Sequence, residues 1–135
     1  MTFLATENPT DDNEPRRIVL HVNFAEGERL NYVLNNVENI VEYYSNLARD
    51  MEIRVVCHGP GLHMLRVDSS PVKDRLVNMA DGVDELSFYA CANTMGRMAL
   101  AEGKQPEIVS QATLVQAGLP EIIELQRLGW TYLKP

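Results

Sequence analysis

Cysteine, basic charge and long apolar runs are all scarce in this 135-residue sequence. The two cysteines, Cys57 and Cys91, are too few for a disulfide scaffold. With 12 Lys and Arg against 19 Asp and Glu, the net charge of −7 argues against binding along a nucleic-acid backbone. No stretch approaches the ~20 apolar residues that span a bilayer, and the N-terminus lacks the features of a secretory signal. We therefore expect a cytoplasmic, reducing location, with no membrane and no nucleic-acid partner.

Part of the negative charge is concentrated at the N-terminus. Residues 1–15 contain Glu7, Asp11, Asp12 and Glu14 but no Lys or Arg, among Asn, Thr and Pro residues. Such a composition cannot bury much apolar surface, so we expect a disordered acidic tail over 1–15. The remaining residues, 16–135, are predicted to form one domain, because a chain with 45% hydrophobic residues can build a real core.

Strand-like and helix-like patterns alternate along the domain. Strands are predicted at 16–24, 51–59, 85–91, 112–118 and 130–135, and helices at 25–50, 70–83, 93–103 and 120–129. Ser70 is predicted to cap the second helix, and Asn93 or Thr94 the third. The connection 58–70 is long, with one helical turn expected near Leu62–Arg66. This alternation predicts an α/β fold, with a mostly parallel sheet covered by helices on both faces.

The ends of two predicted strands carry residues with chemical potential. Cys57 and His58 end one strand, and Cys91 ends another, immediately before Asn93 and Thr94. Parallel strands bring their carboxyl ends to one edge of the sheet, where open α/β folds bind ligands. Both segments are therefore expected at the same edge.

Cys91 is the candidate nucleophile. A thiol reacts as its thiolate, and unpaired N–H groups at a helix start lower the pKa of a nearby cysteine. Asn93 and Thr94 could donate to the sulfur, while His58 and His63 could supply a proton acceptor or a positive charge. The alternative is that Cys91 is a small buried hydrophobic residue, as cysteines at strand ends often are.

The other candidates are weaker. Cys57 continues the inward alternation of its strand, which favours a structural role for this second thiol, and a bridge to Cys91 would not match a CxxC redox motif. The "HGPG" segment, with Gly59 and Gly61, could form an anion-binding turn but lacks the Lys of a phosphate loop. His21 fits a hydrogen-bonded core histidine. The Cys and His spacing predicts no metal site, and we expect no cofactor.

Three segments together resemble the DsrE/DsrF-like family of intracellular sulfur-transfer proteins. They are "VVCHGPGL", "FYACANTM" and "LVQAGLPEIIELQRLGWTYLKP". The resemblance covers 16–135 and implies a three-layer α/β/α sandwich with a five-stranded parallel sheet. It also implies a homotrimer or hexamer, and a persulfide-carrying cysteine that matches Cys91, with His58 on the loop that comes near it. The partners it implies are sulfur donor and acceptor proteins.

Three functions are compatible with the sequence. The first is a sulfur carrier in which Cys91 takes a sulfur atom from one partner and passes it to another. The second is a non-catalytic oligomeric scaffold or regulatory binder with a packed cysteine. The third is a small-ligand, nucleotide-like binder at the strand-end crevice, which is disfavoured because "NFAEGE" after the first strand lacks a phosphate-binding run.

Overall fold

The central sheet contains five parallel strands in the order β4-β3-β2-β1-β5. The computed structural model describes residues 12–135, and the strands within this range are β1 Arg16–Val22, β2 Met51–Cys57, β3 Leu86–Cys91, β4 Ala112–Val115 and β5 Thr131–Leu133. Every pair of neighbours is parallel, as the alternation of strands and helices predicts. All the strands therefore end at one edge of the sheet.

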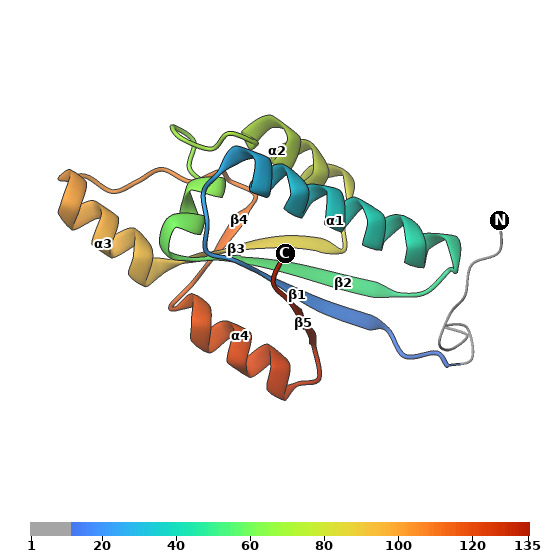
Figure 1. The fold of residues 1–135 in the computed structure, drawn as a ribbon. Coiled ribbons are helices and arrows are strands. Elements are labelled where there is room, and N and C mark those ends of the chain that lie inside the picture. Colours follow the sequence, from blue (N-terminus) through green and yellow to red (C-terminus); the bar gives the residue numbers. More distant parts are fainter. Residues whose placement is uncertain (1–11) are drawn as a thin grey trace.

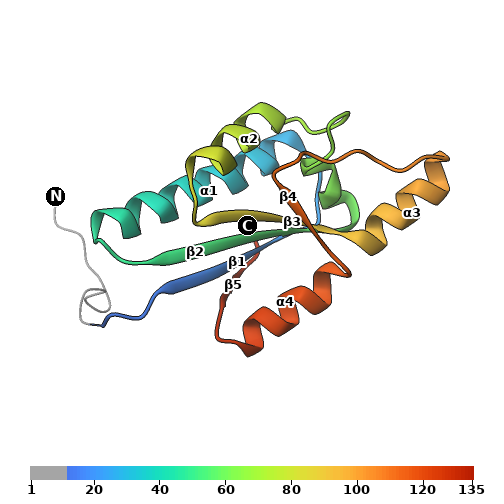
Figure 2. The same cartoon turned by 180° about the vertical axis from the view of Figure 1, so that it is seen from behind.

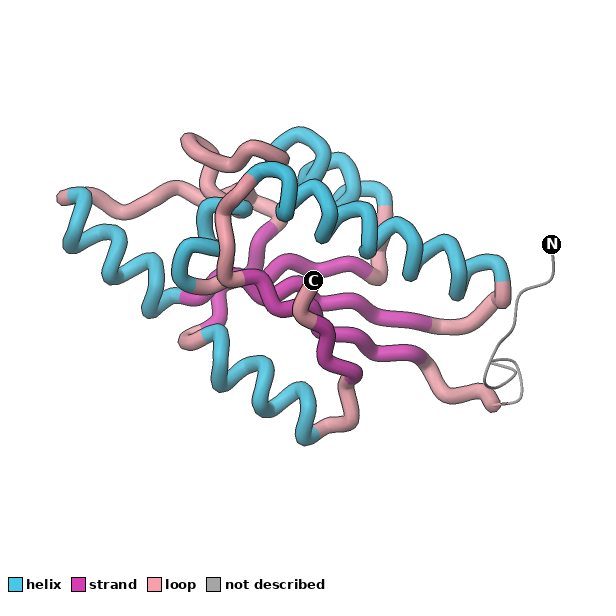
Figure 3. Tube along the Cα trace, in the orientation of Figure 1, coloured by secondary structure: helices cyan, strands magenta, loops and turns pink. Residues whose placement is uncertain are grey.

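Helices cover both faces of this sheet, which gives three layers (Figures 1 and 2). Helices α1 (Gly27–Asn46) and α2 (Lys73–Gly82) lie on one face, and α4 (Gly118–Arg127) lies on the other. Helix α3 (Ala92–Glu102) extends beyond the carboxyl ends of the strands, as the helix and strand colouring of Figure 3 also shows. The predicted three-layer α/β/α fold is confirmed.

The alternation of side chains along the strands divides the core into two clusters. The larger cluster lies under α1 and α2 and includes Leu20, Ile53 and Phe88. The smaller one lies under α4 and includes Val19 and Trp130. Because successive strand residues point to opposite faces, this division also decides which face each strand-end residue occupies.

Some predicted element boundaries are wrong. Ser70 does not cap α2, which begins at Lys73 with Val72 as its N-cap, although the Ser70 hydroxyl accepts a hydrogen bond from the Val72 N–H at 3.3 Å. The helical turn in the long connection is a 3₁₀ helix, η1, at Gly59–Met64, which starts earlier than expected. Helix α4 begins at Gly118 rather than at residue 120. This last difference bears directly on the site.

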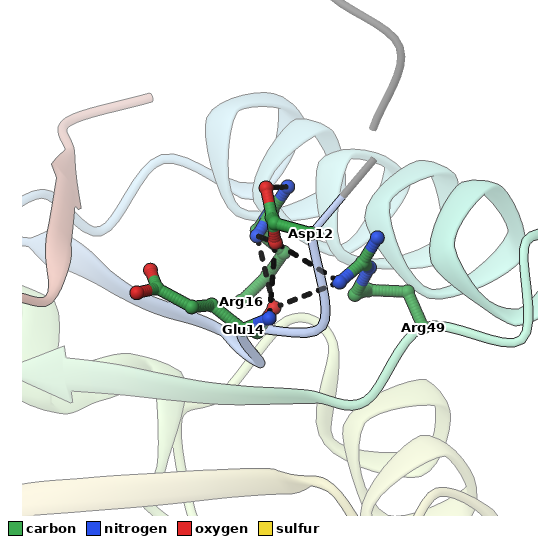
Figure 4. Close-up of polar contacts among 4 residues, drawn as sticks. All are labelled: Asp12, Glu14, Arg16 and Arg49. Atoms are coloured by element: carbon green, nitrogen blue, oxygen red, sulfur yellow. Dashed lines mark hydrogen bonds and ion pairs between the residues drawn. The ribbon is translucent and has the colours of Figure 1, made fainter. Parts of the chain in front are cut away.

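The predicted acidic tail falls mostly on residues 1–11, which lie outside the described residues. Its last part contacts the folded chain (Figure 4). The Asp12 carboxylate accepts hydrogen bonds from Arg16 at 3.1 Å and from Arg49 at 3.0 Å, and the Glu14 carbonyl oxygen accepts one from Arg16 at 2.9 Å. These contacts tie the start of β1 to the turn that follows α1.

Within residues 12–135, no helix combines the length and the apolar character that crossing a bilayer requires.

Candidate functional site

Cys91 joins β3 to α3 and is itself the N-cap of the helix. Its Sγ accepts a hydrogen bond from the Thr94 N–H at 3.5 Å, the place that a Ser, Thr, Asp or Asn oxygen usually takes. The expectation that Asn93 or Thr94 caps this helix is therefore wrong. The sulfur lies at the positive end of the α3 dipole.

A second helix begins beside Cys91. Besides the Thr94 N–H at the start of α3, the main-chain N–H of Gly118, the first residue of α4, favours the Cys91 thiolate. Burial alone would raise the pKa of Cys91. The Thr94 hydroxyl and the main-chain N–H groups favour the thiolate more strongly, so the pKa lies below its ordinary value. These N–H groups include those of Thr94 and Gly118.

The loop after β2 orients the Thr94 hydroxyl. The Gly59 N–H donates to Thr94 Oγ1 at 2.9 Å, which leaves the hydroxyl proton for the cysteine sulfur. Gly61 holds this loop close to the sheet, since a Cβ at Gly61 would overlap the carbonyl group of Val22. The "HGPG" segment thus acts on the site indirectly, by positioning Thr94.

Cys91 is buried but lies outside both hydrophobic clusters. Its exposed fraction is 5%, and neither cluster contains it. Beside it, the exposed side chains of Asn93 and Gln116 bond to each other at 2.8 Å, and the Gln116 carbonyl accepts from the Asn93 N–H at 3.2 Å. The sulfur is therefore enclosed by main-chain donors and a polar rim rather than by the apolar core.

Cys57 has the opposite environment. It lies in the large cluster under α1 and α2, fully buried, with its Sγ 4.0 Å from the Met64 sulfur. Burial raises the pKa of the Cys57 thiol far above its ordinary value. Both cysteines are free, and they project from opposite faces of the sheet.

His21 is the hydrogen-bonded core histidine that the sequence predicts, and one of its partners is His58. His58 Nε2 lies 2.6 Å from His21 Nε2, and His21 Nδ1 lies 2.7 Å from the Tyr132 hydroxyl. Burial, together with Lys134, holds the pKa of His58 below its ordinary value, so the ring is neutral at neutral pH and supplies no positive charge to Cys91. His63 bonds to Ser69 at 2.7 Å instead.

Sequence reasoning missed Gly118. Its N–H contributes to the lowered pKa of Cys91, and a Cβ built on it would lie 2.9 Å from Cβ of His58. Only a glycine permits this close approach of α4 to the end of β2. The signal was the "AGLP" segment, where a glycine two residues before proline follows a strand.

Across the part of the chain that the structure describes, no three His, Cys, Asp or Glu side chains come together as a possible ligand set.

Comparisons with known proteins agree with this architecture. A solved structure from Methanobacterium thermoautotrophicum, the protein of unknown function MTH1491, is similar to the chain with a TM-score of 0.75 and 25% sequence identity. The similarity covers 89% of this chain and 99% of that one. A search of curated proteins finds no match. The sequence matches the DsrE/DsrF-like family over residues 2–135, and the chain therefore belongs to that family.

Proposed function

We propose that the protein is a sulfur carrier that holds a persulfide on Cys91 and passes its outer sulfur atom between partner thiols. The DsrE/DsrF-like family is associated with sulfur relay. The observation that carries the proposal is the convergence of two helix N-termini on the Cys91 sulfur. A packed structural cysteine needs no such donors, whereas a sulfur atom that must carry negative charge does.

Loading begins with the Cys91 thiolate. Its sulfur attacks the outer sulfur of a donor persulfide, R–S–SH; a new S–S bond forms, the donor S–S bond breaks, and the donor leaves as R–S⁻. Cys91 then carries –S–SH, and no external oxidant or reductant is required. A lowered pKa raises the fraction of Cys91 that is present as the attacking thiolate at a given pH.

The groups that favour the Cys91 thiolate during loading also stabilise it when it re-forms during discharge. An acceptor sulfur attacks the outer sulfur of the persulfide, and the S–S electron pair returns to Cys91 Sγ. A thiol of low pKa is the better leaving group in this exchange. The Thr94 N–H already points at the atom on which the charge appears, so this donor needs little reorganisation.

The direct test is loading followed by intact-mass measurement. The purified chain is incubated with a small-molecule persulfide donor, and we expect a mass increase of one sulfur atom in wild type and in Cys57→Ala. The Cys91→Ser variant should show no increase. An unmodified wild-type chain, or an adduct that persists in Cys91→Ser, would contradict the proposal.

The sulfur partners and the assembly belong to the same proposal. The acceptor and donor are proteins that present a thiol or persulfide, and the chain forms a homotrimer or hexamer in the cytoplasm. A scaffold with a packed cysteine would behave differently, because thiol reagents would modify Cys91 only after denaturation.

A further inference from the structure

A row of polar side chains crosses the sheet face under α4. Tyr132 on β5, His21 on β1 and His58 after β2 are joined by two short contacts, Tyr132 Oη to His21 Nδ1 at 2.7 Å and His21 Nε2 to His58 Nε2 at 2.6 Å. The two imidazole rings stack with centroids 4.8 Å apart. His21 is buried, and both of its ring nitrogens make contacts in this row.

The row ends beside Cys91. Cys57 of β2 pairs in register with Ala90 of β3, so the next residues along the two strands are His58 and Cys91. Both residues keep an extended backbone, with ψ of 167° for His58 and 112° for Cys91. Because successive strand residues point to opposite faces, both point away from the large cluster that contains Cys57 and Ala90. Neighbouring strands lie about 4.8 Å apart, which makes His58 the lateral neighbour of Cys91 on this face.

We propose that Tyr132, His21 and His58 form a proton relay that takes the proton of an incoming acceptor thiol during discharge of Cys91 and delivers it to solvent. The proposal rests on the carrier function proposed above. His58 would contact the acceptor and act as the catalytic base, while His21 and Tyr132 act through it.

The proton transfers balance as follows. The acceptor R–SH attacks the outer sulfur of Cys91–S–SH, giving R–S–SH and the Cys91 thiolate, while its proton goes to His58 Nδ1. The His58 Nε2 proton passes to His21 Nε2, the His21 Nδ1 proton passes to Tyr132 Oη, and the Tyr132 hydroxyl proton goes to water. One proton leaves the acceptor and one reaches solvent. Exchange with water restores the starting tautomers.

The electrostatic surroundings keep the relay neutral between transfers. Burial disfavours the charged forms of both imidazole rings, and the positive charge of Lys134, which follows β5, disfavours them as well. From α4, Glu121 lies on this side of the sheet but is paired with Arg54 of β2 at 3.6 Å. Because no carboxylate within residues 12–135 pairs with either ring, the histidines pass a proton on rather than hold it.

The relay is tested by comparing two acceptors on the loaded full-length chain. A simple alkyl thiol must lose a proton, whereas sulfite, at a pH where it carries none, does not. We expect His58→Gln to slow discharge to the thiol by about 100-fold, the usual size of a general-base contribution, and Tyr132→Phe to slow it less. Both variants should discharge to sulfite at the wild-type rate. Tyr43→Phe, an exposed tyrosine of α1, is the matched control.

The outcomes separate the relay from the carrier function. A Tyr132→Phe chain that loads sulfur and discharges to the thiol as fast as wild type would overturn the relay alone. Equal slowing with thiol and sulfite would also overturn it, because a structural defect affects both acceptors. A wild-type chain that takes up no sulfur would overturn the carrier function, and the relay with it.

Discussion

Replacing Thr94 with valine removes one hydroxyl from the site and nearly preserves the side-chain shape. The hydroxyl accepts from the Gly59 N–H at 2.9 Å and donates to the Cys91 sulfur. A hydrogen bond to a charged group contributes about 1.5–3 kcal/mol, and about 1.4 kcal/mol corresponds to a factor of ten in an equilibrium. We therefore expect the thiolate fraction of Cys91 at a pH below its pKa to fall by about tenfold or more.

The assay is the rate of alkylation of Cys91 by iodoacetamide in the native protein as a function of pH, with the modified residue located by peptide mass. Thr94→Val should shift the rate profile to higher pH, while Thr94→Ser, which keeps the hydroxyl, should follow wild type. Valine also leaves the Gly59 N–H without its acceptor, so unfolding free energy should fall by about 1 kcal/mol. A folded Thr94→Val protein with the wild-type profile would refute the reasoning.

Three further predictions concern packing, pH and assembly. Gly118→Ala places a methyl group 2.9 Å from Cβ of His58, so denaturant titration should show a loss of about 1–3 kcal/mol; unchanged stability would contradict the close approach. Burial lowers the pKa of His21 from 6.5 to about 4. Between these two pH values the unfolded chain therefore binds a proton at His21 that the folded chain does not bind. Unfolding free energy should therefore decline as pH falls from 6.5 to about 4, with a shallower decline in His21→Phe; identical slopes would argue against a buried neutral ring. Light scattering should report a homotrimer or hexamer of the 15.2-kDa chain, and a monomer would contradict the assembly that the family resemblance implies.

The layers and strand direction of the fold could be predicted because the patterns are local. Residues 25–50 carry one apolar stripe, and its members Leu30, Val33 and Val37 are buried in α1. The segments on either side are short and rich in residues that favour strands. Alternation of such segments leaves few topologies besides a parallel sheet. Helix starts were harder to place, because the α3 cap is a cysteine and α4 begins before its proline.

The site could be predicted only in part. The junction of strand and helix marked Cys91, since helix-start donors depend on local sequence. The contribution of Gly118 depends on where α4 crosses the ends of β2 and β3, which no local pattern contains. The pairing of His21 with His58 depends on the register of β1 against β2, in which Val22 lies opposite Cys57. Both histidines were visible in the sequence, but their contact was not.

The central claim is that the Thr94 hydroxyl and main-chain N–H groups lower the pKa of Cys91. Its most direct measurement is the ultraviolet thiolate absorbance of the native protein during a pH titration, with the Cys91→Ser signal subtracted. Burial raises the pKa of Cys57, which therefore adds no step near neutral pH. The account predicts a midpoint clearly below the value of about 8.5 for a free cysteine. A midpoint at or above that value would contradict it.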